Sequence, residues 1–126
     1  MGVGERLRQI VTGLMETSNI FEHLPVDRQR EHFETLHQRA GLKLERIISY
    51  GQTTPPGEWY DQDYDEWVLL LQGAAVLRIE GEQGVRSLVP GDYLLLPAHR
   101  RHRVEWTESE GETLWLALHD KLSPVA

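Results

Sequence analysis

The sequence predicts an all-β protein, in the form of a small antiparallel β-barrel or sandwich. From residue 42 onwards, short apolar segments alternate with turns that contain Gly, Pro or acidic residues. About six or seven such segments fall within some 85 residues, which favours a closed barrel or sandwich over a βαβ fold. The length of 126 residues suits one domain with a modest core.

Each predicted strand has a β-type pattern bounded by turn residues. The segments are LKLERIIS (42–49), EWVLLLQG (66–73), AAVLRIEG (74–81), VRSLVPGDYLLLPA (85–98), HRVEWT (102–107) and TLWLALHD (113–120). In AAVLRIEG, the apolar residues Ala75, Leu77 and Ile79 share one face because side chains alternate along a strand. We therefore expect this face to lie in the core.

The chain before residue 41 is less regular. In GERLRQIVTGLM, Leu7, Ile10, Val11 and Leu14 have the spacing of one helical face, so we expect residues 1–18 to form a short helical or irregular N-terminal segment. Between residues 19 and 39 the pattern fits a polar helix or a strand, and we favour a strand over His32–His37. This interpretation gives a single barrel domain at residues 19–126.

Composition argues against several classes of partner. The formal net charge of −7 would repel a phosphate backbone, so no nucleic-acid partner is expected. No apolar run approaches the roughly 18 residues of a membrane span, and no signal-peptide pattern is present. The absence of Cys excludes disulfides and thiolate sites. We expect a soluble, cytoplasmic protein without a membrane partner.

The stretch PAHRRHRVEW (97–106) is the most basic part of the chain. Strand alternation divides it into two faces. Arg101 and Arg103 point outwards, whereas His102 shares the inner face with Val104 and Trp106. The stretch therefore predicts an inward histidine rather than one basic patch.

Glu66 is a second candidate for an inward polar residue. It leads into an apolar run and alternates with Val68 and Leu70. A carboxylate on a core-facing position needs a partner, either an arginine, a cation or a hydrogen-bond donor from a substrate. Glu66 and His102 are thus the two residues that we expect to carry chemistry.

The segments around these residues resemble the paired motifs of the cupin superfamily. Its first motif runs Gly, five residues, His-x-His, three or four residues, Glu, six residues, Gly, and Gly57, Glu66 and Gly73 match it here. In the second motif, Gly91, Pro97 and His102 match, with His99 in place of a glycine and Trp106 in place of an asparagine. The resemblance implies a jelly-roll barrel, also called a double-stranded β-helix.

The resemblance also implies a candidate metal site. In metal-binding cupins the histidine pair, the glutamate and the second-motif histidine bind one divalent metal, typically iron, manganese, nickel or zinc. The pair falls on Tyr60 and Gln62 with a three-residue gap, or on Trp59 and Asp61 with four, so the first motif is degenerate. The implied ligands are His102 and Glu66, with Gln62 or Asp61 as a third. No organic cofactor is expected.

The sequence leaves two functions open. The protein is either a metal-assisted enzyme or a non-catalytic module that binds or senses a small molecule such as an organic acid or sugar. Tyr60, His99 and Trp106 are candidate pocket residues in both cases. The remaining histidines are expected at the surface or as caps, with the barrel mouth as the alternative for some of them; they are His23, His32, His37 and His119. Small cupins commonly pair through their sheets, which predicts a homodimer.

Overall fold

The computed structural model describes residues 15–122, and this part of the chain consists of β-strands and connecting segments without a helix. The strands are β1 (His32–Arg39), β2 (Leu42–Ser49), β3 (Asp65–Gln72), β4 (Ala75–Ile79), β5 (Val85–Leu88), β6 (Tyr93–Leu96), β7 (His102–Thr107) and β8 (Thr113–Asp120). The predicted all-β fold is therefore confirmed.

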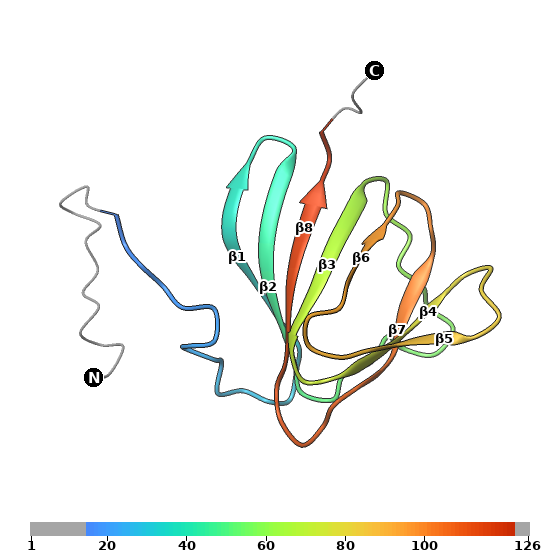
Figure 1. Cartoon of the computed structure of the whole chain (residues 1–126), viewed down its shortest axis with the longest axis horizontal. Helices are drawn as coiled ribbons and strands as arrows, with labels where there is room; N and C mark the ends of the chain where they lie inside the picture. The colour runs from blue at the N-terminus through green and yellow to red at the C-terminus, as the bar shows by residue number, and fades with distance from the viewer. Residues whose placement is uncertain (1–14, 123–126) are drawn as a thin grey trace.

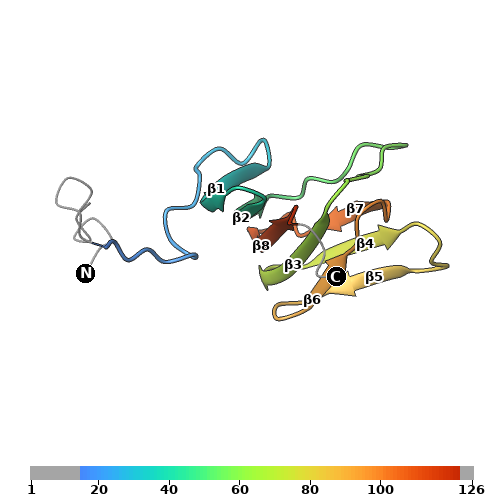
Figure 2. The same ribbon diagram turned by 90° about the horizontal axis from the view of Figure 1, so that it is seen from above.

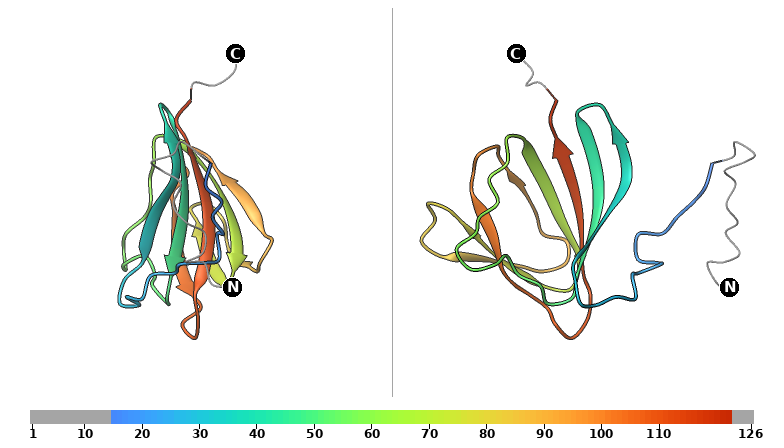
Figure 3. Two further views of the ribbon diagram at one scale, coloured as in Figure 1. Left: turned by 90° about the vertical axis from the view of Figure 1, so that its left-hand side faces the viewer. Right: turned by 180° about the vertical axis from the view of Figure 1, so that it is seen from behind.

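The strands form two antiparallel sheets (Figure 1). One sheet has the order β1-β2-β8-β3-β6 and the other the order β5-β4-β7. Figures 2 and 3 show the same sheets from above, from the side and from behind. After β3 the chain passes repeatedly from one sheet to the other, so strands distant in sequence become neighbours. This is the jelly-roll architecture that the resemblance implied.

The main core lies between the two sheets. Its side chains come from alternate positions on facing strands, including Val68 and Leu70 on β3, Leu77 on β4 and Trp115 on β8. The predicted inner face of β4 is confirmed, because residues 75, 77 and 79 are all buried. Burial of these apolar side chains supplies most of the favourable free energy of the fold.

A smaller apolar cluster lies on the outer face of the five-stranded sheet. Ile48, Tyr50 and Leu114 are buried there, and Leu24 of the N-terminal segment packs against them. Figure 2 shows the N-terminal segment, in blue, extending beyond the β1 edge of the five-stranded sheet. The segment around Leu24 thus covers part of the outer face.

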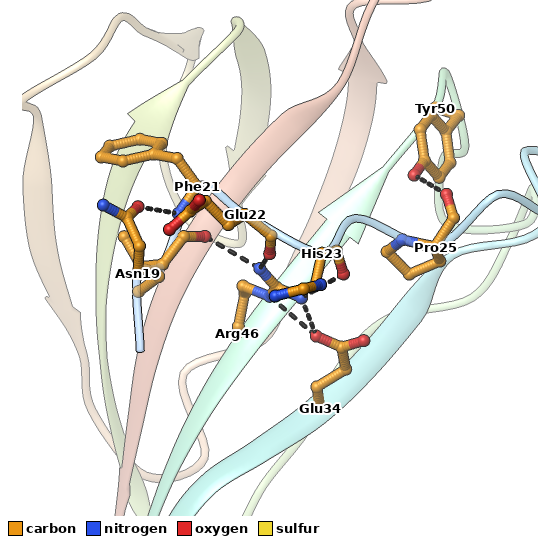
Figure 4. A network of polar contacts seen from close by, with 9 residues as sticks. Asn19, Phe21, Glu22, His23, Pro25, Glu34, Arg46 and Tyr50 are labelled. Carbon is orange, nitrogen blue, oxygen red and sulfur yellow. Dashed lines mark hydrogen bonds and ion pairs between the residues drawn. The ribbon is translucent and has the colours of Figure 1, made fainter. Parts of the chain in front are cut away.

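Arg46 fixes this segment by hydrogen bonds (Figure 4). Its guanidinium donates to the carbonyl oxygens of Ile20, Glu22 and His23, and it also pairs with the carboxylate of Glu34 on β1. Each donation uses a charged donor, which strengthens the bond relative to a neutral pair. The buried charge of Arg46 is therefore fully used in holding the segment on β1 and β2.

The predicted elements match the structure with two differences, and one prediction lies outside the described residues. The strand favoured over His32–His37 is confirmed and extends to Arg39 as β1. The segment 85–98 is divided into β5 and β6 by the turn at residues 89–92. The helical face predicted around Leu7 lies outside the described residues, and the domain boundary at residue 18 stays a prediction.

A bulge in β7 changes the face of Trp106. Val76 and Leu77 of β4 are paired with Trp106 and Val104, so Glu105 is an extra residue on β7. Beyond the bulge Thr107 is buried, whereas Trp106 is 44% exposed. The expectation that Trp106 shares the inner face with His102 is therefore wrong, because simple alternation does not account for the inserted residue.

Between residues 15 and 122, no helix is long and apolar enough to cross a bilayer.

Candidate functional site

A cavity of about 110 Å³ lies between the two sheets. Its floor is apolar and includes Val68, Leu77 and Trp115 from the core. Polar side chains gather on its walls and mouth, and these are Glu31, Glu45, Tyr60, Gln62, Glu66, His102 and His119. We call this cavity the inner pocket.

The loop before β3 reaches the inner pocket because it runs alongside β7. The backbone of Tyr60 exchanges two hydrogen bonds with that of His102, and Gln62 accepts a backbone hydrogen bond from His99. Side chains alternate along this extended loop. Tyr60 and Gln62 therefore line the pocket, and the motif alignment with the three-residue gap is the one whose two residues face inwards.

The outward arginines of the HRRHR cluster hold this loop and its neighbours. Arg103 donates to the backbone carbonyls of Thr54, Pro55 and Glu58, and Arg101 pairs with Glu80. Both cations are therefore engaged by protein groups.

Glu66 and His102 meet at the centre of the pocket, as predicted. Nδ1 of His102 lies 3.2 Å from the carbonyl oxygen of Arg100, which can only accept, so Nδ1 donates and carries the proton. Nε2 then faces Oε1 of Glu66 at 3.9 Å, which is too far for a hydrogen bond. Both side chains are buried. The pair thus leaves polar atoms available to a ligand or a shared proton.

Tyr60 covers the same histidine from the mouth of the pocket. Its ring is stacked on that of His102, with the centroids 5.4 Å apart and the planes at 23°. Burial and the neighbouring carboxylates of Glu31 and Glu66 raise the pKa of the Tyr60 phenol above 10.0. The hydroxyl therefore stays protonated at neutral pH.

A second carboxylate–histidine pair lines the same pocket, and sequence reasoning missed it. Nε2 of His119 on β8 lies 2.9 Å from Oε1 of Glu45 on β2. The expectation that His119 lies on the surface or acts as a cap is wrong, because β8 places it inwards two residues after Ala117 and next to Glu66. Alternation with Trp115 and Ala117 was the signal that could have found it.

Asp61 and His99 lie outside the inner pocket. Both side chains are exposed, and Oδ1 of Asp61 is 3.3 Å from Nδ1 of His99. His99 has a φ of 64°, the left-handed conformation that favours glycine, which explains why the family motif has glycine at this position. Of the sequence-predicted site residues, the structure brings together Glu66, His102, Gln62 and Tyr60, and leaves Asp61, His99 and Trp106 elsewhere.

Burial controls the ionisation of the pocket carboxyls. The pKa of Glu66 is raised above 4.5, chiefly because burial penalises its charged form; His119, His102 and the Gln62 hydrogen bond oppose the shift, and Glu45 adds to it. Burial also raises the pKa of Glu31, against a hydrogen bond from Ser49. The pocket therefore holds carboxyl groups whose protonated form is favoured more than in water.

The donor set does not fit a tightly held divalent metal. Catalytic zinc sites take three protein ligands, whereas the motif positions here supply one imidazole and one carboxylate. Gln62 offers an amide oxygen, a weak ligand, and Tyr60 a protonated phenol. Within residues 15–122, no group of three or more His, Asp or Glu side chains has the arrangement that could hold a metal ion.

The inner pocket is acidic. Three glutamates line it, and no Lys or Arg occurs among the described residues in its wall. An anionic ligand group buried here would have no cationic partner in the wall, which is strongly unfavourable, and repulsion from the glutamates would raise its free energy further. The pocket therefore favours neutral or positively charged groups over phosphate or carboxylate.

Comparison with known proteins agrees with this architecture. The cupin domain family model matches residues 47–119. The structure of a putative mannose-6-phosphate isomerase from Ralstonia eutropha is similar, with 47% identity, a TM-score of 0.82, and coverage of 86% of this chain and 100% of that one. No curated protein matches significantly.

More distant structures share the fold. A cupin superfamily protein from Desulfitobacterium hafniense is 21% identical, with a TM-score of 0.64 and coverage of 77% of this chain and 83% of its own. KdgF from a Halomonas species is 22% identical, with a TM-score of 0.62 and coverage of 82% of this chain and 92% of its own. On the family match and the 47% identical structure, the chain belongs to the cupin domain family.

Proposed function

We propose that the protein binds a small molecule whose hydroxylated part, neutral or positively charged, enters the inner pocket. The acidic wall carries this proposal: Glu31, Glu45 and Glu66 line the pocket, and no Lys or Arg lines it among the described residues. Lys43, which pairs with Glu45, is not part of this lining. Hydroxyl and ammonium groups donate to carboxylates, whereas phosphate and carboxylate groups would be repelled.

The apolar floor supports the same ligand class. Trp115 and Val68 offer carbon-rich surface beneath the polar rim, and a few polar groups above an apolar floor are typical of small-molecule sites. A cavity of about 110 Å³ is smaller than the usual drug-sized pocket, so a short polyol or one end of a sugar is the best match. The similar structure named as a putative mannose-6-phosphate isomerase is consistent with a sugar-like ligand.

A charge series of three-carbon probes tests the proposal. Glycerol, its amine 2-aminopropane-1,3-diol and its acid glycerate have similar size and differ in charge. In NMR titrations of the full chain, we expect the amine and glycerol to shift pocket amides, with glycerate weakest by about tenfold. Glu66→Gln should reduce the preference for the amine. Stronger binding of glycerate than of glycerol would overturn the proposal.

Metal analysis separates this function from the metal-dependent one. We expect protein purified without an affinity tag to carry no stoichiometric metal, also after incubation with iron, manganese, nickel or zinc salts. The His102→Ala and Glu66→Ala variants serve as controls. One equivalent of metal in the unmodified protein, lost in both variants, would contradict a metal-free pocket.

Proton transfer is a second candidate function, favoured by the raised pKa of Glu66 beside His102. Protonated Glu66 would give its proton to a carbonyl oxygen while Nε2 of His102 removes a proton from the adjacent carbon, which yields an enediol. When the protons return to the enediol at the opposite carbon and oxygen, the carbonyl moves to the neighbouring carbon. An aldose and a ketose would thus be interconverted. Deuterium uptake from D₂O into glyceraldehyde at C2, lost in His102→Asn, would support this function, and no uptake above background would exclude it for that substrate.

We also propose that the protein forms a homodimer. The outer face of β3 and β6 presents half-exposed or exposed apolar side chains, with the rings of Trp67 and Tyr93 in contact and Leu95 beside them. A face of this kind suits a second copy of the chain. Light scattering should give the dimer mass, and Tyr93→Lys should shift it to the monomer; a monomer mass for the unmodified protein would overturn the proposal.

A further inference from the structure

A second, more open cavity of about 590 Å³ adjoins the inner pocket. Its lining residues come from the β1–β2 turn, the end of β8 and the chain before β3. Figure 1 shows these three segments at the same end of the five-stranded sheet. Strand register brings these ends together, since Asp120 on β8 is paired with both Leu42 and Asp65. We call this cavity the outer depression.

The two cavities have opposite charge. Arg39, Lys43 and Lys121 line the outer depression, where Glu45 is the only acidic residue among the described lining residues. The described wall of the inner pocket holds three glutamates and no Lys or Arg. Neighbouring cavities with opposite charge fit a ligand that carries an uncharged hydroxylated part and an anionic part.

Glu45 and His119 belong to the walls of both cavities. Oε2 of Glu45 lies 3.1 Å from Nζ of Lys43, and Oε1 lies 2.9 Å from Nε2 of His119. The single carboxylate of the depression is thus already neutralised by protein groups. Nδ1 of His119 is buried and has no hydrogen-bond partner within residues 15–122.

Two of the three cations have no carboxylate partner among the described residues. The Lys121 ammonium lies 4.6 Å from the ring centroid of Tyr64, a cation–π contact that leaves its N–H donors available. The side chain of Arg39 is exposed, and its guanidinium makes no hydrogen bond or ion pair within residues 15–122. A guanidinium and an ammonium at one depression are the groups that bind phosphate and carboxylate oxygens.

We infer that the outer depression is an anion-binding subsite for the phosphate or carboxylate end of the ligand whose hydroxylated end enters the inner pocket. The inference rests on the proposed function and adds a second charged group to the ligand class. The shared wall at Glu45 and His119 allows one molecule to contact both cavities. It also explains how an acidic pocket can serve an anionic ligand, because the charge would lie outside that pocket.

Inorganic phosphate tests the subsite independently of any sugar. We expect phosphate to shift the backbone amides of residues 39–43 and Lys121 in NMR spectra, compared with sodium chloride at equal ionic strength. Arg39→Gln with Lys121→Gln should abolish these shifts, and Arg100→Gln, which removes a cation elsewhere on the surface, should leave them. Acetate in place of phosphate distinguishes a carboxylate from a phosphate site. If phosphate and acetate both leave these amides unshifted, the inference is overturned.

Glucose and glucose 6-phosphate test whether the two cavities act together. We expect the phosphate ester to bind about tenfold more tightly at low salt, and the Arg39→Gln/Lys121→Gln variant to lose that advantage while its affinity for glucose is unchanged. Equal binding of the two sugars by the unmodified protein would refute the subsite and leave the proposed function intact. Phosphate shifts without binding of either sugar would refute the proposed function and support the anion site alone.

Discussion

Glu45 and Arg46 are neighbours on β2, and both side chains are buried, but they lie on opposite faces of the sheet. Arg46 faces outwards and donates to three carbonyl oxygens and the Glu34 carboxylate. Glu45 faces the inner pocket, where its partner His119 keeps a nitrogen without a partner in residues 15–122 and the Glu66–His102 pair stands 3.9 Å apart. All the hydrogen-bond donors of the outward-facing Arg46 are therefore used, whereas the residues of the inner pocket keep unused donors and acceptors.

This difference distinguishes a charged residue that stabilises the fold, such as Arg46, from one that is available to bind a ligand, such as those of the inner pocket. A buried charge that serves stability must be completely hydrogen-bonded, because each missing bond costs free energy. A site that binds a ligand must retain groups that the ligand completes. Substitutions on the two faces of β2 and its neighbours should therefore have effects of different size and kind.

The largest effect is expected for Arg46→Ala. The change removes the guanidinium from Glu34 and three backbone carbonyls, and it should lower the free energy of unfolding by about 3 kcal/mol. Urea denaturation measures this loss. The exposed Arg30→Ala, which removes a surface pair with Asp27, should cost well under 1 kcal/mol. If Arg46→Ala lowers the free energy of unfolding by less than about 1 kcal/mol, the hydrogen bonds of Arg46 do not anchor the N-terminal segment.

Glu66→Gln should affect ligand binding and stability in opposite directions. Binding of 2-aminopropane-1,3-diol should weaken by about tenfold, because the acceptor for its ammonium becomes a neutral amide. The unliganded variant should gain about 1 kcal/mol of stability at pH 8, because it avoids burying a charge. A decrease in both stability and binding would show that Glu66, like Arg46, is a structural residue.

The pH dependence of this gain has a defined sign. Burial raises the pKa of folded Glu66 above the unfolded value, so its favourable contribution is present below the unfolded pKa and is lost as the pH rises through the folded pKa. The stability difference between Glu66→Gln and the unmodified protein should therefore grow from pH 4.5 to pH 8. The same substitution at the exposed Glu110 is the matched control for the loss of one carboxylate.

His99→Gly should stabilise the protein by about 0.5–1 kcal/mol. The left-handed backbone at φ 64° is strained for histidine and free for glycine, and the ion pair with Asp61 that the substitution removes is at the surface. Thermal unfolding of this variant and of Asp61→Asn, which removes only the ion pair, separates the two contributions. Destabilisation by His99→Gly with binding unchanged would show that the surface pair outweighs the strain.

The smallest effect is expected for Trp106→Ala. Because the bulge in β7 leaves this ring exposed and outside the inner pocket, the substitution should leave ligand binding unchanged and cost about 0.5 kcal/mol of stability. Calorimetric titration and urea denaturation of the same sample measure both quantities. A decrease in affinity of about tenfold would instead indicate that Trp106 faces the pocket, as simple alternation predicts.

Much of the barrel was predictable because its strands obey local rules. Turn residues bound them, and alternation placed the apolar side of β4 and the inward His102 correctly. Prediction failed at Trp106, where one extra residue reverses the alternation, and at His119, although its alternation with the buried Trp115 and Ala117 indicated an inward side chain. The bulge at Trp106 depends on how β7 pairs with β4, and no local pattern contains that information.

The sequence by itself determined the all-β class, the motif spacing from Gly57 to His102, and the pairing of Glu66 with His102 in one pocket. Only the tertiary structure decided that Glu45 and His119 join them and that Arg39, Lys43 and Lys121 gather in an adjoining depression. The physical reason is strand register: cross-strand neighbours are set by hydrogen-bond pairing of distant segments, while side-chain alternation is set within each strand.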